Sequence, residues 1–441
     1  MTKNTPINDF LGSVAVRGMS FLGVSSDTNT NNPKSLIELS EKLISTKGNA
    51  SGLASAHKIL TSYAEMDLTQ KTEFFLGVVD AFGCDSQATK LLVDEYAAKP
   101  SPDLLPKIAI SATPRYAKLI SRLNQRPAST LPIVRMRADL LSVLRENPSL
   151  EPLDTAFKDV FSSWFNRGFL QLKKIDWQAT GAILENIIRY EAVHGIAGWD
   201  DLARRIKPSD RMIYGFFHHN LEDEPLIFVE VALTTEIPTS IGTILSNKTD
   251  ELDPRLATTA VFYSISNCQD GLRGVELGNF LIKQVVSDLQ QRCPNLKEFI
   301  TLSPIVKFGD WMRSHVSEGM QLPSEVSDLE EGKEKKALME AAAWFLSEHK
   351  SKSGLPSDPV CKFHIGNGAR LEQINWAAQK NTVGLGNSFG IMANYRYIID
   401  DIEKNHENFV ANGTVTTSTA VRKLAKRYPK VPKENPPKVD G

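Results

Sequence analysis

The sequence predicts a multidomain α and α/β protein, in which a bundle of helices precedes a domain built on a mixed sheet. Three observations lead to this fold. The 441 residues are more than one ordinary hydrophobic core accommodates. Apolar residues recur three and four positions apart through the first part of the chain. Alternating, strand-like runs begin only after about residue 165.

The first part of the chain predicts a lead-in followed by helices. Residues 1–32 are polar, and Asn and Thr crowd their second half, so we expect a flexible segment. The helical region covers 33–165. Leu36, Leu39 and Leu43 share one face of its first helix, and similar apolar stripes follow. No constellation of acids, bases or nucleophiles stands out there, so we expect this domain to serve assembly.

Residues 166–441 predict a mixed α/β domain with a basic tail. The elements follow the order strand, helix, two antiparallel strands, strand, helix and strand, which favours a mixed sheet with one parallel crossover. The proline-rich end from about Arg422 is typical of extended or disordered chain. In order, the runs are GFLQLKKIDW, ATGAILENIIRYEAV, RMIYGFFHHN, EPLIFVEVALTTEI, TTAVFYSISN, GVELGNFLIKQVVSDLQQ and LKEFITLSP.

Composition excludes several classes of function. The chain is 41% hydrophobic and 23% charged, as soluble globular proteins are, and its net charge of -1 argues against a general nucleic-acid binder. A local basic pocket for one phosphorylated ligand remains possible. Four scattered cysteines lack metal-ligand spacing, so we expect reduced thiols and no metal site. No long uncharged apolar run predicts a membrane helix.

The stretch SNCQDGLRGVELGNF joins a predicted strand to the following helix. Gly271, Gly274 and Gly278 allow positive φ and close approach of a ligand to the backbone. Free N–H groups at the helix start favour a pyrophosphate, and Arg273 adds positive charge. The spacing matches neither a Walker loop nor a dinucleotide fingerprint. On these residues alone, an anion site and a plain turn with a glycine packed against the sheet are equally good interpretations.

Two further candidates lie downstream. Ser303 ends the strand LKEFITLSP, at the edge where α/β sheets bind ligands, but Ser-Pro also simply ends strands. His364 stands just before a Gly-Asn-Gly turn, and the run after that turn has helical spacing. A single histidine is more often a core or surface residue than a catalytic one. The residues by themselves leave both roles open.

Four stretches together carry a family resemblance. FYSISNCQDGLRGVELGNFLIKQV, TLSPIVKFGDWM, FHIGNGARLEQINWAA and FGIMANYRY resemble malonyl-CoA decarboxylases, over about Gly168 to Asp400. The resemblance implies a GNAT-like (N-acetyltransferase-like) catalytic domain behind a helical domain that forms dimers or tetramers. In that fold two parallel strands splay apart, and the acyl-CoA enters the opening.

The resemblance also assigns roles to residues. Ser303, His364, Glu276 and Tyr397 match the family's catalytic set, in which Glu276 would orient Ser303 or His364 and Tyr397 would shape the pocket. Ser303 and His364 would hold the malonyl carboxylate, and one of them would protonate the enolate. No cofactor is expected, because the thioester itself takes up the electrons. The malonyl-CoA site would comprise Ser303 and His364 with the loop Arg273, Gly274, Val275, Glu276, Leu277, Gly278 and Asn279.

Two alternative functions remain for this fold. An acyl-CoA acyltransferase would need a groove for an amine acceptor, and a CoA-binding regulatory module would need no catalytic set. The presence of all four catalytic residues argues against the second. The start, MTKNTPINDF, lacks the features of a secretory or mitochondrial signal, and the end, PPKVDG, lacks a peroxisomal one. We therefore expect a cytoplasmic, bacterial enzyme.

Overall fold

The computed structural model describes residues 32–46, 48–125, 127–221, 223–246, 250–275, 281–316 and 321–428. These belong to two compact units. Of the described residues, the first unit comprises those within 32–171, 217–226 and 268–275, and the second those within 172–216, 227–267 and 281–428. The prediction of an N-terminal helical region followed by a mixed α/β sheet domain is confirmed.

The first unit is a helical bundle. Its packing follows from the predicted stripes, since Leu36 and Leu43 of the first helix are buried together with Phe74, Phe157 and Phe161. The helices are α2 (Pro33–Ser45), α3 (Asn49–Ala64), α4 (Leu68–Phe82), α5 (Ser86–Ala98), α6 (Leu104–Ala112), α7 (Tyr116–Leu123), α8 (Thr130–Val143) and α9 (Glu151–Trp164).

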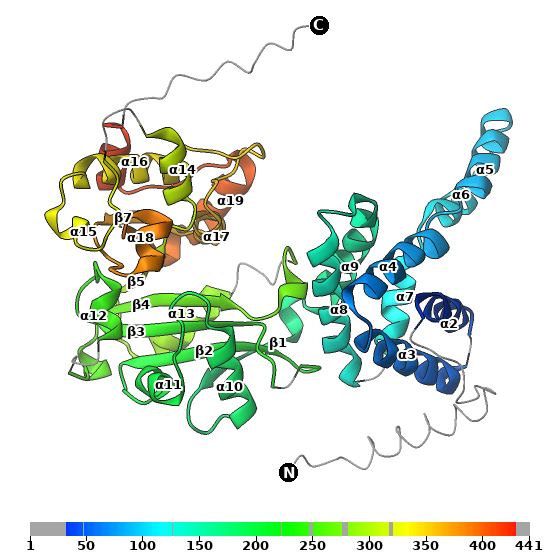
Figure 1. Cartoon of the computed structure of the whole chain (residues 1–441), viewed down its shortest axis with the longest axis horizontal. Helices are drawn as coiled ribbons and strands as arrows, with labels where there is room; N and C mark the ends of the chain where they lie inside the picture. The colour runs from blue at the N-terminus through cyan, green and yellow to red at the C-terminus, as the bar shows by residue number, and fades with distance from the viewer. Residues whose placement is uncertain are drawn as a thin grey trace, which may run out of the picture. The chain divides into compact units, whose positions relative to one another are not determined.

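Helices α5 and α6 form a hairpin with little core of its own. Figure 1 shows them extending away from the other helices of this unit. No side chain of α5 is buried, and Leu104 is the only buried residue of α6. Several large apolar side chains are consequently exposed on the hairpin, among them Leu91, Leu105 and Ile110.

The second unit is organised by an eight-stranded mixed sheet in the order β1-β2-β3-β4-β5-β8-β6, with β7 paired to β8. The predicted hairpin of β2 and β3 is antiparallel, and β4 and β5 are the predicted parallel pair. The strands are β1 (Leu170–Ile175), β2 (Arg211–His218), β3 (Ile227–Thr234), β4 (Thr259–Asn267), β5 (Glu298–Thr301), β6 (Ser303–Pro304), β7 (Arg370–Asn375) and β8 (Met392–Arg396).

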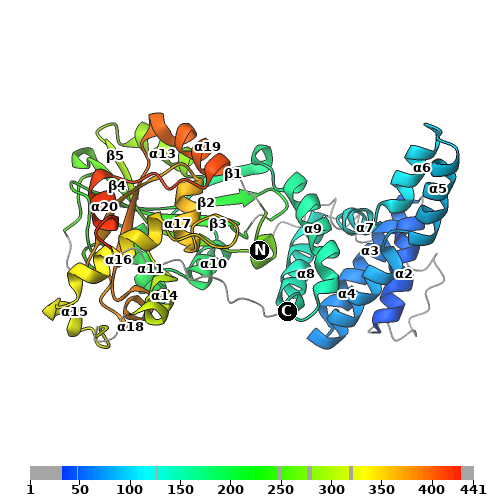
Figure 2. The ribbon, with the colours of Figure 1, turned by 90° about the horizontal axis from the view of Figure 1, so that it is seen from above.

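Helices surround this sheet. Figures 1 and 2 show α10 and α11 beside β2 and β3, and in Figure 1 the helices α14, α16, α17 and α18 lie around β7. The described part of the crossover helix begins at Leu281. The helices are α10 (Gly181–Tyr190), α11 (Trp199–Ile206), α12 (Ile241–Leu245), α13 (Leu281–Arg292), α14 (Phe308–His315), α15 (Asp328–Glu331), α16 (Lys335–Ser347), α17 (Pro359–Gly366), α18 (Thr382–Ser388), α19 (Ile402–Asn412) and α20 (Thr419–Ala425).

The run after the Gly-Asn-Gly turn is a strand, so its interpretation as a segment with helical spacing was wrong. Residues 370–375 form β7, which pairs antiparallel with β8. The register shifts between Leu371 and Gln373, as in a β-bulge. With this irregularity, Leu371 and Ile374 are both buried although they stand three positions apart in the sequence, which is the spacing of one face of a helix.

The parallel strands β4 and β5 separate after a short pairing. Their register runs from Thr259 opposite Glu298 to Phe262 opposite Thr301. Just beyond, Ser303 pairs with Ala393 of β8 instead. Strand β4 meanwhile continues to Asn267, so an opening forms between the carboxyl-terminal ends of the two strands. This divergence is the feature that the family resemblance implied.

Candidate active site

A cavity of about 310 Å³ lies where β4 diverges from its parallel neighbour. Ser303 and His364 both face it, together with Ser264 from the opposite wall. The remaining lining is mostly apolar, and none of the described lining residues is a lysine or an arginine. The full lining is Val193, Phe262, Tyr263, Ser264, Ile265, Asn267, Ser303, Pro304, Pro359, Val360, Phe363 and His364.

Three of the four expected catalytic residues form one row of hydrogen bonds. The Oγ of Ser303 lies 3.0 Å from the Nε2 of His364. The other ring nitrogen of His364, Nδ1, lies 2.9 Å from the hydroxyl of Tyr397. All three side chains are buried. Tyr397, expected to shape the pocket, thus contacts the imidazole directly.

Each member of the row is placed by a different element. Ser303 belongs to β6, where Pro304 follows it at the end of the ladder. His364 lies in the last turn of α17, which Asp358 caps and Pro359 begins. Tyr397 follows β8, and its backbone N–H donates to the carbonyl of Phe299 at 2.8 Å. Long-range sheet pairing therefore brings these distant positions together.

Burial keeps His364 neutral. Its ring stacks on Tyr395, with centroids 4.6 Å apart, and desolvation lowers the pKa of His364 to about 3. Burial raises the pKa of Tyr397 well above its usual value, so that hydroxyl stays protonated. Near pH 7 the row consists of neutral groups that both donate and accept hydrogen bonds.

Thr301 is a member of this site that the sequence did not indicate. The hydroxyl of Ser303 donates to the Oγ1 of Thr301 at 2.8 Å. The backbone N–H of Tyr395 donates to the same oxygen at 3.1 Å. Thr301 stands two residues before Ser303, and that alternation along an extended segment was the available signal.

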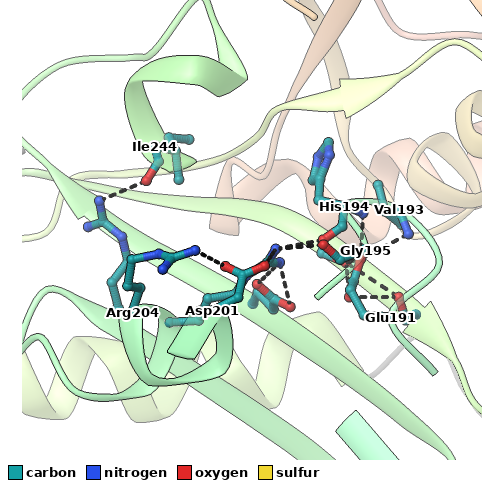
Figure 3. Close-up of polar contacts among 12 residues, drawn as sticks. Glu191, Val193, His194, Gly195, Asp201, Arg204 and Ile244 are labelled. Atoms are coloured by element: carbon teal, nitrogen blue, oxygen red, sulfur yellow. Dashed lines mark hydrogen bonds and ion pairs between the residues drawn. The ribbon is translucent and has the colours of Figure 1, made fainter. Parts of the chain in front are cut away.

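A second polar group, built around Glu191, supports the opposite wall (Figure 3). Ser264 donates to the two carboxylate oxygens of Glu191 at 2.8 and 2.7 Å, and Ser266 donates at 3.1 Å. The backbone N–H groups of Val193 and His194 donate to the same carboxylate at 2.9 and 2.7 Å. Because its proton is directed to a carboxylate, Ser264 offers acceptor lone pairs to its surroundings. Ser264 and Ser266 lie in the first of the four quoted stretches, but Glu191, on which the group is built, lies outside all of them.

An ion pair lies beside that group. The Nη1 of Arg205 contacts the carboxylate of Glu230 at 3.2 and 3.0 Å. Its Nη2 donates to the carbonyl of His194 at 2.7 Å. Arg205 therefore ties the segment that carries His194 to strand β3, which stabilises the wall next to β4.

The predicted phosphate-binding turn is described only in its first part, within the first unit. Arg273 is 73% exposed at its side chain and bonds to Asp270 at 3.1 Å. Gly274 has φ 75°, the left-handed region that favours glycine, and Val275 is buried. The other candidate residues of the loop lie outside the described residues. They are Glu276, Leu277, Gly278 and Asn279.

The turn is held by helix α8. A Cβ on Gly271 would lie 1.8 Å from the carbonyl oxygen of Val134, so the glycine permits direct contact with the helix backbone. Arg137 of α8 is fully buried and donates to the carbonyls of Gly271 at 2.6 Å and Arg273 at 2.9 Å. Its Nε donates to Asp154 at 2.8 Å. The expected packed glycine is thus present, but it packs on a helix.

Neither a cluster of metal ligands nor a membrane-spanning helix occurs in the described residues. Within those ranges, no three His, Cys, Asp or Glu side chains come together as ligands for a metal ion. No helix in the described part of the chain is both long and apolar enough to cross a bilayer.

Comparison with known proteins agrees over both parts of the chain. Residues 168–435 match the family model for the malonyl-CoA decarboxylase C-terminal domain, and 82–165 match that for the N-terminal domain. The mitochondrial malonyl-CoA decarboxylase of Anser anser anser is 34% identical over 72% of this chain and 70% of its own length. The Mus musculus enzyme is 30% identical over 82% of this chain and 83% of its length.

Solved structures give the same result. A crystal structure of malonyl-CoA decarboxylase from Rhodopseudomonas palustris has a TM-score of 0.82 and 40% identity, covering 89% of this chain and 99% of its own. The Agrobacterium vitis malonyl-CoA decarboxylase structure has a TM-score of 0.80 and 42% identity, covering 88% of this chain and 99% of its own.

Proposed function

The chain belongs to the malonyl-CoA decarboxylase family and is a carboxy-lyase, and we propose that it performs its reaction with the hydroxyl of Ser303 and the imidazole of His364. The observation that carries this proposal is the hydrogen-bonded row Ser303–His364–Tyr397 at the cavity where β4 diverges. The substrate is malonyl-CoA, and the products are acetyl-CoA and CO2.

The protein must stabilise the enolate that forms in this reaction and must then supply a proton to it. The bond between the methylene carbon and the carboxylate breaks, and its electron pair flows into the thioester carbonyl, which gives CO2 and an enolate. Donors must stabilise the oxygen on which charge develops, at about 3 kcal/mol for each well-placed donor. A proton must then reach the carbon to give acetyl-CoA. The thioester is the electron sink, so the mechanism calls for no metal or organic cofactor.

The composition of the cavity favours this chemistry. An arginine or lysine paired with the malonyl carboxylate would stabilise the ground state more than the transition state and would slow the loss of CO2. None of the described residues that line the cavity is an arginine or a lysine. The polar groups Ser303 and His364 are neutral donors. We assign them to hold the carboxylate in the orientation that decarboxylation requires.

The row also provides a path for the proton. While Ser303 donates to Thr301, His364 donates from Nε2 to Ser303 and accepts from Tyr397 at Nδ1. If the Ser303 proton turns from Thr301 to His364, the other tautomer forms and both hydrogen bonds of the imidazole reverse. If Ser303 or His364 gives a proton to the enolate carbon, the neighbouring group in the row can therefore supply another proton through the hydrogen bond between them. Tyr397 is a positioning residue in this scheme, because it acts through the imidazole.

We propose that the CoA pyrophosphate binds the turn that contains Arg273, Gly274 and Val275. The exposed guanidinium of Arg273 and the left-handed Gly274 support this assignment. Residues 276–279 complete the loop in the proposal, and Glu276 orients Ser303 or His364. These latter assignments rest on the family resemblance.

Self-association to a dimer or tetramer is also proposed, with the α5–α6 hairpin as the surface that a second copy of this chain covers. The exposed apolar side chains Leu91, Leu105 and Ile110 support that role. A bacterial cytoplasmic location stays a prediction, since similar proteins include mitochondrial enzymes of animals and bacterial enzymes.

The test is direct. The purified protein is incubated with malonyl-CoA and a chelator, and CO2 and acetyl-CoA are measured. We expect equal amounts of both products at a rate that the chelator does not change. Free CoA appearing only when an amine is added would indicate an acyltransferase. Binding of malonyl-CoA without any product would indicate a regulatory module.

A further inference from the structure

We propose that Asp358 is a positioning residue, whose carboxylate holds the segment after Ser303 against the helix that carries His364. The inference rests on the proposed function of Ser303 and His364. Asp358 does not belong to the hydrogen-bonded row itself, and the role assigned to it is to set the geometry between the two catalytic side chains.

The carboxylate of Asp358 serves two segments at once. Its Oδ1 accepts the backbone N–H groups of Val360 and Cys361, both at 3.0 Å, as an N-cap of α17 does. Its Oδ2 accepts the N–H groups of Val306 at 2.9 Å and Lys307 at 3.1 Å. Only 1% of the residue is exposed. Four backbone donors therefore converge on one buried carboxylate.

The two segments are those that carry the catalytic pair. Val306 follows Ser303 by three residues, and Val360 precedes His364 by four. Because only three or four residues separate these amides from Ser303 and His364, the carboxylate that fixes the amides also restricts where the two catalytic side chains lie. Loss of the Oδ2 contacts would leave the Ser303 segment untied to α17 at this point.

An ordinary helix cap does not explain the second pair of contacts. Asp67 and Asp85 also cap helices, and their carboxylates accept the backbone N–H of Gln70 and Ala88, three residues on in each case. Those contacts stay within one turn of the same helix. Asp358 instead reaches a distant segment, and that segment leads back to the serine. The four N–H bonds also satisfy a carboxylate whose pKa burial would otherwise raise further.

The expected effect follows from the geometry that the reaction needs. Displacement of a catalytic group by about 1 Å can cost about 10²-fold in rate. The substitution Asp358→Ser keeps an oxygen that caps α17, but one short hydroxyl cannot also reach the other segment. We therefore expect kcat to fall about 10- to 100-fold with KM nearly unchanged, and the melting temperature to fall as well, because the N–H groups of Val306 and Lys307 lose their acceptor. Asp67→Ser and Asp85→Ser are matched controls and should leave kcat unchanged.

A second background separates positioning from general structural support. In a Ser303→Ala enzyme there is no serine hydroxyl to position, so adding Asp358→Ser should lower kcat by less than about threefold. Equal losses in the two backgrounds, measured well below each melting temperature, would mean that Asp358 supports the fold only and would overturn the inference. Asp358→Asn serves as a second variant, because its NH2 group faces backbone donors where the carboxylate accepted them.

The outcomes distinguish this inference from the function on which it rests. A Ser303→Ala enzyme with parental kcat would overturn the proposed function and this inference together. Parental kcat in Asp358→Ser beside a strongly impaired Ser303→Ala enzyme would overturn only the role of Asp358. A large loss in the parent background that nearly disappears without the serine hydroxyl is the predicted result.

Discussion

At the residue scale, burial decides what His364 does. An exposed imidazole would be partly charged near pH 7 and would bind the malonyl carboxylate as an ion pair, which slows decarboxylation. Inside the wall of the cavity, desolvation lowers the pKa of His364 to about 3, and Ser303 and Tyr397 satisfy both ring nitrogens. The same burial that makes the side chain look like a core histidine makes it suitable as a neutral donor.

This neutrality has a consequence for stability. The folded-state pKa of His364 is about 3, against an ordinary value of 6.5, so the unfolded chain binds the proton first. The contribution is fully present above pH 6.5 and is lost as the pH falls toward 3. Between pH 7 and 5 the free energy of unfolding should fall by about 2 kcal/mol more in the parent than in His364→Asn. Urea titrations at the two pH values measure the difference.

Other buried histidines do not affect the difference in pH dependence between the parent and His364→Asn. His194 and His218 also have pKa values lowered to about 4 by burial, and they contribute with the same sign. Both are present in the parent and in the variant, so their contributions cancel in the difference. Identical pH dependence in the two proteins would show that His364 is accessible to protons in the folded state.

At the scale of elements, the turn after β4 depends on a helix of the first unit. Arg137 is fully buried on α8 and bonds to the carbonyls of Gly271 and Arg273. A planar guanidinium reaches two carbonyls and Asp154 at the same time, which a lysine ammonium cannot reproduce. The helical unit therefore shapes the proposed pyrophosphate turn in addition to any role in assembly.

Arg137→Lys tests this dependence. The lysine keeps a positive charge beside Asp154, but it lacks the planar guanidinium that donates to the carbonyls of Gly271 and Arg273, so the turn should lose its preorganised shape. We expect KM for malonyl-CoA to rise roughly tenfold, about 1.4 kcal/mol, with kcat little changed. Malonyl-pantetheine lacks the pyrophosphate, and its kcat/KM should stay near the parental value. Steady-state kinetics with both substrates measure the split.

The control comes from the same helix. Arg135 lies two residues away, and its 64% exposed side chain contacts Glu224 at 3.5 Å, so Arg135→Lys should behave as the parent with both substrates. An equal loss with malonyl-CoA and malonyl-pantetheine in Arg137→Lys would contradict a pyrophosphate site on this turn.

The sequence could predict elements wherever their pattern was local and regular. The order of strands around β2 to β5 and the position of Ser303 at a strand end followed from alternation and from a terminating proline. Strand β7 was misread, because a bulge lets Leu371 and Ile374, three positions apart as on a helix face, both be buried. Asp358 before Pro359 is a recognisable helix start, but its bonds to Val306 and Lys307 depend on tertiary folding and leave no local signal.

Only part of the candidate site could be predicted from the sequence. Ser303, His364 and Tyr397 could be selected because the family resemblance grouped motifs that physical reasoning left separate. Thr301 lies inside the stretch TLSPIVKFGDWM but had no role assigned to it, and Glu191 lies in none of the four stretches, so both roles come from side-chain contacts. The positions of Glu276 and the rest of its loop lie outside the described residues, so their assignment stays a prediction.

At the scale of the whole molecule, the helical unit exposes large apolar side chains to solvent, and a contact with another chain would bury them. On the α5–α6 hairpin, Leu91 is 64% exposed and Ile110 is 76% exposed. Exposed apolar patches on soluble proteins commonly mark interaction sites, and the family resemblance implies self-association through the helical domain. The hairpin is therefore the part of this unit that we expect a second copy to cover.

Charged substitutions on the hairpin test the assembly. The double variant Leu91→Glu with Ile110→Glu should reduce the molar mass measured by light scattering, because two carboxylates would have to be desolvated in the interface. Its melting temperature at low concentration should stay close to that of the parent, since neither side chain is in the core. Val410→Glu, at a site 69% exposed on α19, is the matched control and should keep the parental mass. An unchanged mass in the double variant would place the interface elsewhere.

The central claim is that Ser303 and His364 act as one unit on malonyl-CoA, and a double-mutant cycle tests it most directly. The measurement is kcat for the parent, Ser303→Ala, His364→Asn and the double variant, with CoA affinity and melting temperature as controls. Each single change should lower kcat by about 10²–10⁴-fold with little effect on CoA binding. The double variant should lose far less than the product of the two losses. A His364→Asn protein that melts early yet turns over at the parental rate in the cold would contradict the account and make His364 a core histidine.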